Sequence, residues 1–332
     1  MNRNVCVRCA ALALLNVVLP SSRADAQATW GGYVQTRFST DYRTTSGFSI
    51  RRAKLYTSAV APFDTSLSGR MQAIFRWQNA GTLTLQDVFA EYRVTGVSFR
   101  AGQFVPEFSL QRLQPDAAMP VVERALVVDA LVPSAETYAR DIGAQIATHP
   151  FSRLQITLGA FNGNGGNQSG NNDRQLLYVA RTVFQTFLAE NLQIHAGASF
   201  AYRNKSAMVF KKIFGTTVPF SGEDARWGGE FLLSSSAWIL QTEYIEAHLG
   251  ADKADGYYVL GAVFLDGTNE LAGLAEQLHD LDPKTNDAVW YGAGWNHYFA
   301  ENRFKCQVAV RGQFVSGHNQ YATIVQLQTF IH

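Results

Sequence analysis

The chain has 332 residues with 28 basic and 27 acidic side chains, and its formal net charge is +1. This balance argues against a nucleic-acid-binding protein, which normally carries a clear excess of positive charge. No run of 18 or more apolar residues occurs, so the sequence excludes a protein that crosses a membrane with helices.

The first residues have the features of a cleavable secretory signal. Arg3 and Arg8 precede an apolar run at 10–19, and small residues with the A-x-A spacing of a cleavage site follow at 24–28. The apolar run is about half as long as the ~20 residues that a membrane-spanning helix needs. We therefore expect removal of residues 1–28, which leaves a domain of 29–332 with a formal charge of −1 and a single cysteine.

Alternation of apolar and polar residues indicates β-strands with one charged face. In 67–78 apolar residues take most odd positions, and polar residues that include Arg70 and Arg76 take most even positions. The same period recurs in 303–315. Successive side chains of a strand point to opposite faces of the sheet. A polar face with several arginines is typical of a membrane barrel with a wet lumen rather than of a soluble sandwich.

Sixteen strand candidates, separated by clusters of Gly, Pro, Asn and Asp, follow one another without a convincing long helix. The segment 268–279 is the weakest of them, because it could equally form a short helix. An even count returns both ends of the chain to the same side of a barrel. The candidates span 31–41, 48–61, 66–78, 82–94, 97–104, 138–148, 153–161, 174–187, 191–203, 225–235, 237–247, 257–265, 268–279, 288–299, 303–315 and 321–331.

The connections between these strands alternate in length. Those after even-numbered strands are mostly short, whereas those after odd-numbered strands include 105–137, 162–173, 204–224, 248–256 and 280–287. Short turns on one side and long loops on the other are expected of an outer-membrane barrel. Aromatic residues make up 12% of the chain, which suits the girdles of such a barrel. The pattern predicts an all-β fold, a transmembrane antiparallel β-barrel.

One set of segments carries a family resemblance. The segments are Phe48–Tyr56, Leu85–Arg93, Phe99–Arg112, Glu123–Ala125, Arg140–Gly143, Glu270–Asp282 and Trp290–Phe299. Together they resemble the phosphate-selective porin O and P family over about 31–331. The resemblance implies a homotrimeric, sixteen-stranded outer-membrane porin whose third external loop, here 105–137, folds inward and narrows the channel. It also supports counting 268–279 as a strand.

Strand parity assigns the charged side chains to the lumen, because an Arg or Lys that faces lipid at mid-depth costs ~2–4 kcal/mol. Rings of Arg and Lys lower the barrier for anions, and the planar fork of Arg suits phosphate and carboxylate groups. An alternative is that Asp87 and Glu91 neutralise nearby arginines and leave a weakly selective pore. The candidate pore-lining residues are Arg52, Lys54, Arg70, Arg76, Asp87, Glu91, Arg93 and Arg100.

Within the loop 105–137, Arg112 and Arg124 are the candidates for the constriction. Each could instead pair with a carboxylate and pin the loop to the wall. The loop contains no lysine, whereas the resemblance implies lysines at the constriction of phosphate-specific members. We therefore expect passive diffusion of small anionic solutes such as phosphate-like ions, without strict phosphate selectivity.

Charged groups in the external loops predict contacts with the surroundings. Three lysines in 204–224 are expected to be solvated, although they could attract anions or the phosphates of lipopolysaccharide. Outer-membrane lipid and lipopolysaccharide are thus the expected partners besides solutes, with no nucleic acid. The lysines are Lys205, Lys211 and Lys212.

Other motifs do not support a different chemistry. The glycine-rich stretch 163–170 lacks the Lys-Ser/Thr pair of a phosphate-binding loop. The histidines lack metal-ligand spacing, so neither a metal site nor a cofactor is predicted. Two alternatives to a channel stay open: a barrel that acts as an adhesin or receptor through its external loops, and an outer-membrane hydrolase. No nucleophile motif accompanies the possible bases, so an enzyme is not predicted; those bases are His149, His195, His248, His297 and His318.

Overall fold

A computed structural model describes residues 28–76, 81–171, 173–282, 288–300, 303–315 and 318–331. The expected signal segment therefore lies outside the described residues, apart from Ala28. The last two residues of the predicted strand 66–78 lie outside them as well. None of the helices in these ranges is long and apolar enough to cross a membrane.

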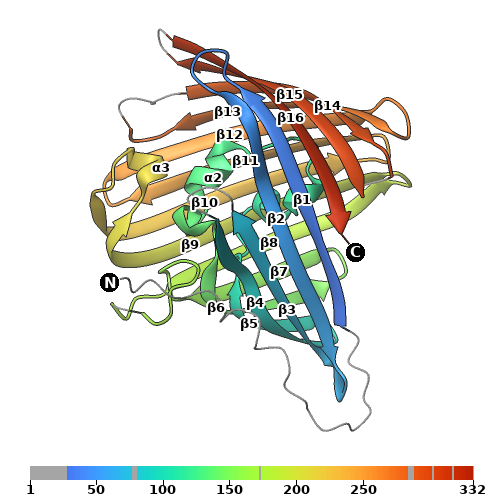
Figure 1. Ribbon diagram of the computed structural model, residues 1–332. Helices are drawn as coiled ribbons and strands as arrows, with labels where there is room; N and C mark the ends of the chain where they lie inside the picture. The colour runs from blue at the N-terminus through green and yellow to red at the C-terminus, as the bar shows by residue number, and fades with distance from the viewer. Residues whose placement is uncertain are drawn as a thin grey trace, which may run out of the picture.

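The strands form one closed antiparallel barrel in which each strand pairs with its neighbours in sequence and β1 pairs with β16 (Figure 1). All the predicted strands are present, and the ambiguous segment 268–279 is a strand, so that prediction is confirmed. The strands are β1 (Ala28–Thr40), β2 (Ser46–Ala61), β3 (Asp64–Arg76), β4 (Thr82–Val94), β5 (Val97–Phe104), β6 (Asp141–Phe151), β7 (Leu154–Phe161), β8 (Leu177–Ala189), β9 (Leu192–Val209), β10 (Pro219–Ser234), β11 (Trp238–Leu249), β12 (Asp252–Phe264), β13 (Asn269–His279), β14 (Ala288–Tyr298), β15 (Phe304–Val315) and β16 (His318–Ile331).

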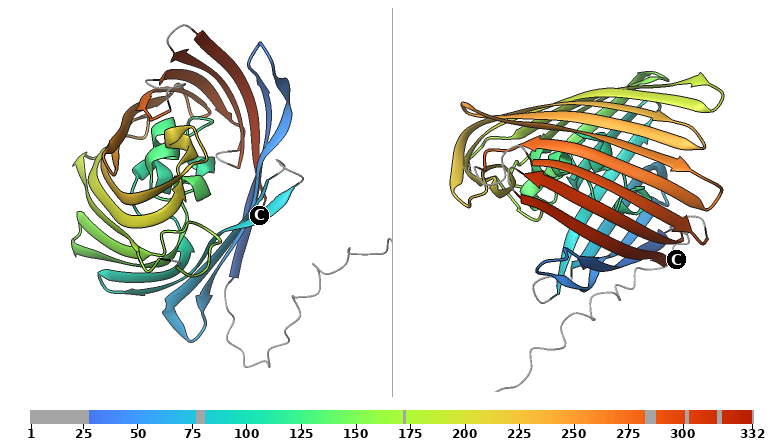
Figure 2. Two further views of the ribbon diagram at one scale, coloured as in Figure 1. Left: turned by 90° about the vertical axis from the view of Figure 1, so that its left-hand side faces the viewer. Right: turned by 90° about the horizontal axis from the view of Figure 1, so that it is seen from above.

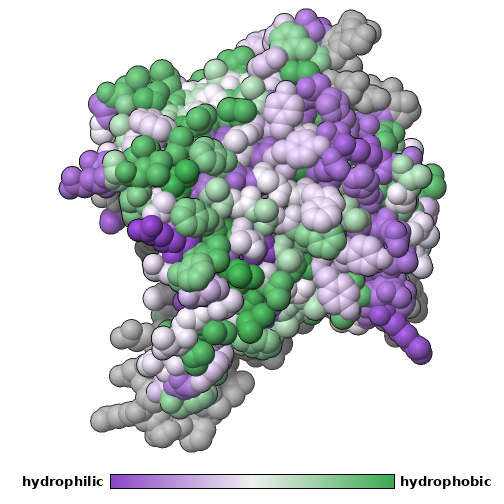
Figure 3. Space-filling view, turned by 180° about the vertical axis from the view of Figure 1, so that it is seen from behind, coloured by the Kyte–Doolittle hydropathy of each residue, from purple (hydrophilic) through white to green (hydrophobic). Residues whose placement is uncertain are grey.

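The wall is apolar outside and polar inside, as the alternation predicts. In β11, Leu240 and Tyr244 are exposed on the outer face, whereas Gln241 and Glu243 between them are buried toward the lumen. Figure 3 shows apolar side chains spread over the outer wall, with hydrophilic ones gathered mostly toward the right-hand edge. This arrangement suits a barrel that meets lipid outside and water inside.

Two β-bulges near the middle of the wall change the parity expected from the sequence. In the β1–β2 pair, Gln35 pairs with Arg52 and the next pair skips Arg51. In the β3–β4 pair, the register likewise skips Gln86. A bulge inserts one extra residue and re-aims the side chains around it. Consequently two adjacent residues, Arg51 and Arg52, both line the inside of the barrel.

The connection between β5 and β6 folds into the lumen. It contains α1 (Leu110–Leu113), η1 (Asp116–Ala118), α2 (Leu126–Leu131) and η2 (Ala135–Thr137). Figure 2 shows these helices enclosed by the ring of strands. The helix α2 packs against β11, β12 and β13, where Val128 and Leu131 join a core with Ile245 and Tyr258. The loop therefore fills one side of the lumen and leaves the β1–β5 side open.

Two predicted boundaries are wrong in ways that affect function. The strand expected from 138 begins at Asp141, so Tyr138 belongs to the loop. The loop expected at 204–224 is shorter, because β9 and β10 extend into it and leave only 210–218, which holds α3 (Lys211–Phe214). Lys205 consequently lies in β9, where its ammonium group is buried and 2.9 Å from Asp173 Oδ1.

Candidate functional site

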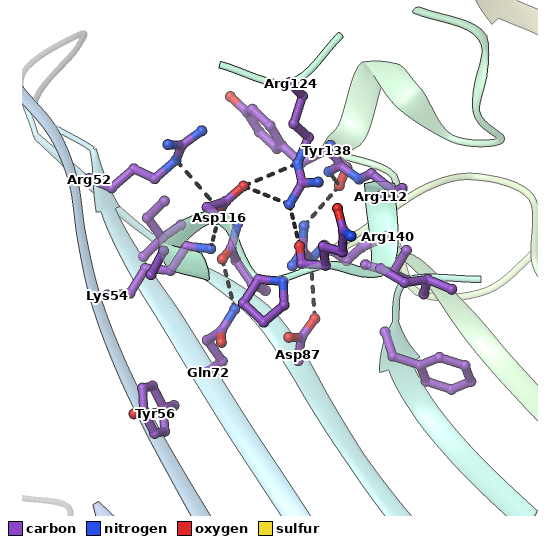
Figure 4. A pocket seen from close by; sticks show the side chains of 18 of the residues that line it. Arg52, Lys54, Tyr56, Gln72, Asp87, Arg112, Asp116, Arg124, Tyr138 and Arg140 are labelled. Carbon is purple, nitrogen blue, oxygen red and sulfur yellow. Dashed lines mark hydrogen bonds and ion pairs between the residues drawn. The ribbon is translucent and has the colours of Figure 1, made fainter. Parts of the chain in front are cut away.

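A cavity of about 710 Å³ lies between the inward loop and the strands β1–β5 (Figure 4). Its charged lining is strongly asymmetric, with ten basic and three acidic side chains. The basic residues are Arg51, Arg52, Lys54, Arg70, Arg76, Arg100, Arg112, Arg124, Arg140 and Lys212, and the acidic residues are Asp87, Asp116 and Asp129.

Asp116 is the carboxylate at the centre of the cavity wall. Its Oδ2 lies 2.6 Å from Nζ of Lys54 and 3.6 Å from Nε of Arg52, and its Oδ1 lies 2.9 Å from Nη2 of Arg124. Burial alone would raise the pKa of Asp116, but these three cations hold it well below its usual range. The carboxylate thus stays ionised and links the loop to β2.

Glu123 forms a second link between the loop and the wall. It accepts hydrogen bonds from Arg37 of β1 and, at 2.8 Å, from Nη2 of Arg51 of β2. Burial opposes ionisation of Glu123, but Arg51 and Arg37 outweigh it and lower the pKa to about 2. The bulge in β2 makes this link possible by turning Arg51 inward.

The opposite side of the loop is held by its helix ends. Glu243 of β11 accepts hydrogen bonds from the backbone N–H groups of Leu110 and Gln111, at 3.1 and 2.7 Å. Glu276 of β13 accepts one from the N–H of Leu126. Free N–H groups at a helix start favour such anionic acceptors. The loop is thereby fixed on both sides of the barrel.

Three arginines of the cavity contact Tyr138. Its carbonyl oxygen accepts hydrogen bonds from Nη2 of Arg112 and, at 2.9 Å, from Nη1 of Arg140. Its ring lies under the guanidinium group of Arg76, at 3.2 Å from the ring centroid. The φ of Tyr138 is +62°, a left-handed conformation that is strained for a bulky residue.

The structure places most of the predicted residues on this cavity. Glu91 and Arg93 do not line it: they form an ion pair of 2.7 Å toward the end of β4, and Glu91 also contacts Arg100 at 3.1 Å. The predicted residues that line the cavity are Arg52, Lys54, Arg70, Arg76, Asp87, Arg100, Arg112 and Arg124.

The two loop arginines pair within the loop rather than with the wall. Nη1 of Arg112 lies 3.2 Å from Asp129, and Arg124 contacts Asp116. The ion pairs between the loop and the wall join carboxylates of the loop to cations of the wall, such as Lys54. The loop is therefore pinned to the wall, as the alternative supposed, but by its carboxylates and not by Arg112 or Arg124.

Four residues of the site were missed in the sequence. Arg51 faces inward only because of the bulge, which parity does not reveal. Tyr138 and Arg140 fell at the edge of an expected strand, although the resemblance already drew attention to 140–143. Lys212 is exposed, as expected, but nothing in the sequence indicated that its ammonium group also donates to the carbonyl oxygens of Asp129 and Ala135, at 2.9 and 3.1 Å.

Some residues of the cavity lining carry buried hydrogen-bond donors that have no partner among the described residues. Four of these atoms are the hydroxyl of Tyr33, Nε of Arg100, Nε of Arg112 and Nη1 of Arg124. All four residues line the cavity. Buried donors normally find partners. Because these atoms are shielded, the lining is suited to an anionic solute by its excess of cations rather than by these donors. Groups of His, Cys, Asp and Glu fit to hold a metal are absent from the described ranges.

Comparisons with known proteins agree with this architecture. The family model of the phosphate-selective porins O and P matches residues 23–312. Solved structures with a similar fold include the anion-selective porin from Comamonas acidovorans, with a TM-score of 0.65, 10% identity and coverage of 92% of this chain and 100% of that chain. Pseudomonas putida OprB gives a TM-score of 0.65, with 9% identity and coverage of 92% and 94%.

An outer-membrane protein of Vibrio cholerae, OmpT in its trimer form, gives a TM-score of 0.60, with 12% identity and coverage of 92% and 99%. At these identities the likeness to solved structures shows the fold alone. No curated protein sequence matches significantly.

Proposed function

Because this chain belongs to the phosphate-selective porin O and P family and forms an outer-membrane channel, we propose that it lets small anions diffuse in preference to cations. The observation that carries the proposal is the cavity lining, in which ten cations face three carboxylates. Rings of Arg and Lys lower the electrostatic barrier for anions and raise it for cations.

The residues have different parts in this proposal. Arg52, Lys54, Arg70, Arg76, Asp87 and Arg100 line the channel, and Arg112 and Arg124 form the narrow part from the loop side. Glu91 and Arg93 act beyond the cavity, where they pair with each other. Eight of the ten cations are arginines, whose planar forks bind carboxylate as well as phosphate. Phosphate-like ions are therefore one class of solute among several.

The proposal is tested with purified protein in planar bilayers. Stepwise conductance shows pore formation, and the reversal potential across a potassium chloride gradient gives the sign of the selectivity. We expect a reversal potential whose sign shows that chloride permeates more readily than potassium. The opposite sign would contradict the proposal, since it would show that the carboxylates dominate the lumen. Protein denatured before reconstitution is the control for detergent artefacts.

We also propose that the channel has no catalytic role. Three of the possible bases in the described part of the chain contact carboxylates or an amide rather than a nucleophile: His195 with Glu230, His248 with Glu246 and His297 with Asn269. A role as adhesin or receptor is not favoured, because α3 of the expected long loop folds onto the inward loop. Channel conductance without hydrolysis of ester or peptide substrates is the expected result.

The assembly and processing of the chain belong to the same proposal. We infer a homotrimer embedded among outer-membrane lipid and lipopolysaccharide; the family membership and the trimer form of the similar Vibrio cholerae protein support it. We also infer cleavage of residues 1–28 on export, so that the mature chain begins within the first residues of β1 (Ala28–Thr40). Native mass spectrometry of protein extracted from membranes tests both, since it reports the number of subunits and the mass of the mature chain.

A further inference from the structure

Most cations of the cavity already have carboxylate partners. Asp116 serves the three cations around it, and the other pairs are Arg51 with Glu123, Arg140 with Asp87, Arg112 with Asp129 and Arg100 with Glu91. Arg70, Arg76 and Lys212 form no ion pair with any residue in the described ranges. The positive charge that remains for a solute is therefore concentrated at these three positions.

The two unpaired arginines lie against tyrosine rings. The guanidinium carbon of Arg76 is 3.2 Å from the ring centroid of Tyr138, and that of Arg70 is 4.9 Å from the ring centroid of Tyr56. Arg70 also donates to Gln72 at 3.1 Å, whereas Arg76 makes no hydrogen bond with the part of the chain that the structure describes. The N–H donors of Arg76 are thus available, and Tyr138 is 48% exposed beside them.

Tyr138 has a left-handed backbone conformation that is unfavourable for a tyrosine. Left-handed conformations are costly for bulky residues and persist only where the surroundings enforce them. Here Arg112 and Arg140 clamp the carbonyl oxygen of Tyr138, and Ala139 beside it also has a positive φ, of +54°. Tyr138 lies in the cavity lining beside Arg112 and Arg140 (Figure 4), and the guanidinium group of Arg76 lies over its ring.

We propose that the channel selects organic anions that carry an aromatic ring, aryl carboxylates, and that Arg76 and Tyr138 form the subsite for them. This inference rests on the anion preference proposed above. An inorganic anion uses only the charge of Arg76. A benzoate-sized anion brings its carboxylate to the fork of Arg76 and its ring to the exposed phenol of Tyr138, so it gains both contacts. The other rings that line the cavity are Tyr33, Tyr56, Phe89, Phe104 and Phe330.

The experiment compares two acids of similar size and equal charge, benzoate and cyclohexanecarboxylate, as blockers of the chloride current through the whole protein in planar bilayers. An aromatic contact predicts that benzoate halves the current at a concentration about fivefold lower than cyclohexanecarboxylate. Inorganic phosphate is the third probe, and we expect that a higher concentration of phosphate than of benzoate is needed to halve the current. Each probe is added from either side of the membrane.

Two variants of one residue separate the ring from the backbone of Tyr138. Tyr138→Phe keeps the ring and should keep the preference for benzoate, whereas Tyr138→Leu should make the two acids equivalent. Equal block by both acids in the unmodified protein, no block by either, or a preference that survives Tyr138→Leu would overturn the inference. The reversal potential in potassium chloride is measured on the same membranes, so that the two proposals can fail separately. Cation selectivity would contradict the proposed function itself. Anion selectivity without a preference for benzoate would contradict only the choice of aryl carboxylates as the solute.

Discussion

Nη2 of Arg51 lies 2.8 Å from Oε2 of Glu123, so the residue that the β2 bulge inserts joins the wall to the inward loop. Without the bulge, Arg51 would alternate with Arg52 and face lipid. The bulge therefore performs two tasks, since it avoids a charge in the hydrocarbon region and supplies an anchor for the loop.

Loss of this anchor should weaken the fold measurably. Arg51→Ala removes two hydrogen bonds to a carboxylate that Arg37 then holds alone. Hydrogen bonds to charged groups contribute about 1.5–3 kcal/mol, and we expect the free energy of unfolding to fall by that amount. Urea unfolding of the barrel in lipid vesicles measures it. Arg153→Ala, in the exposed turn between β6 and β7, is the matched control and should leave the free energy unchanged.

The attachment of the loop should depend on pH through Glu123. Its pKa is lowered in the folded protein to about 2 from an ordinary 4.5, so the folded state is stabilised by the ionised form. This stabilisation is complete above about pH 4.5 and is lost as the pH falls toward 2. Pepsin, which works in this range, should cut the segment 105–140 increasingly below pH 4.5. Protection that stays constant down to pH 2 would contradict the linkage.

The variant Glu123→Gln gives the control for this titration. It removes the ionisable group but keeps the shape of the side chain, so cleavage should be higher at pH 5 and should change less between pH 5 and pH 2. Cleavage at sites outside the loop, read by mass spectrometry in the same digest, shows whether the whole barrel opens.

The barrel itself could be predicted from the sequence, because alternation of side chains has a fixed period and lipid penalises any strand that breaks it. Even β13 (Asn269–His279), which is rich in Ala, Leu and Glu, follows the alternation once it is aligned with its neighbours. The strands beside the open cavity were located correctly, and most of their charged residues line that cavity.

The bulge, the contacts of Lys212 and the conformation of Tyr138 could not be predicted from the alternation, since they depend on contacts between distant segments. The bulge at Arg51 shows itself only in the register with β1. Lys212 is exposed, as its loop predicts, but the carbonyl oxygens that its ammonium group binds lie more than seventy residues away, so that contact could not be predicted. The left-handed backbone at Tyr138 could not be predicted, because Gly or Asn, not Tyr, is the residue expected in this conformation.

Arg112→Ala and Arg124→Ala should each shift the reversal potential toward cations, because each removes a positive charge from the cavity and leaves its carboxylate partner behind. The shift should be larger for Arg112→Ala: Asp129 has no other ion pair with the described residues, whereas Asp116 retains Lys54 and Arg52. Planar-bilayer measurements in a potassium chloride gradient give both values. If neither potential moves, the two arginines have a structural role only.

Removal of the central carboxylate should have the opposite effect. Asp116→Asn keeps the size of the side chain but leaves Lys54, Arg52 and Arg124 without their shared counter-charge, so the preference for chloride over potassium should rise. The increase should shrink in 1 M salt, where the screening length falls to about 3 Å from about 10 Å at 0.1 M. Asp266→Asn, in the exposed turn between β12 and β13, makes the same substitution away from the cavity and should leave the selectivity unchanged. A fall in anion preference on Asp116→Asn would mean that Asp116 acts by shaping the loop, since loss of its charge alone can only favour anions.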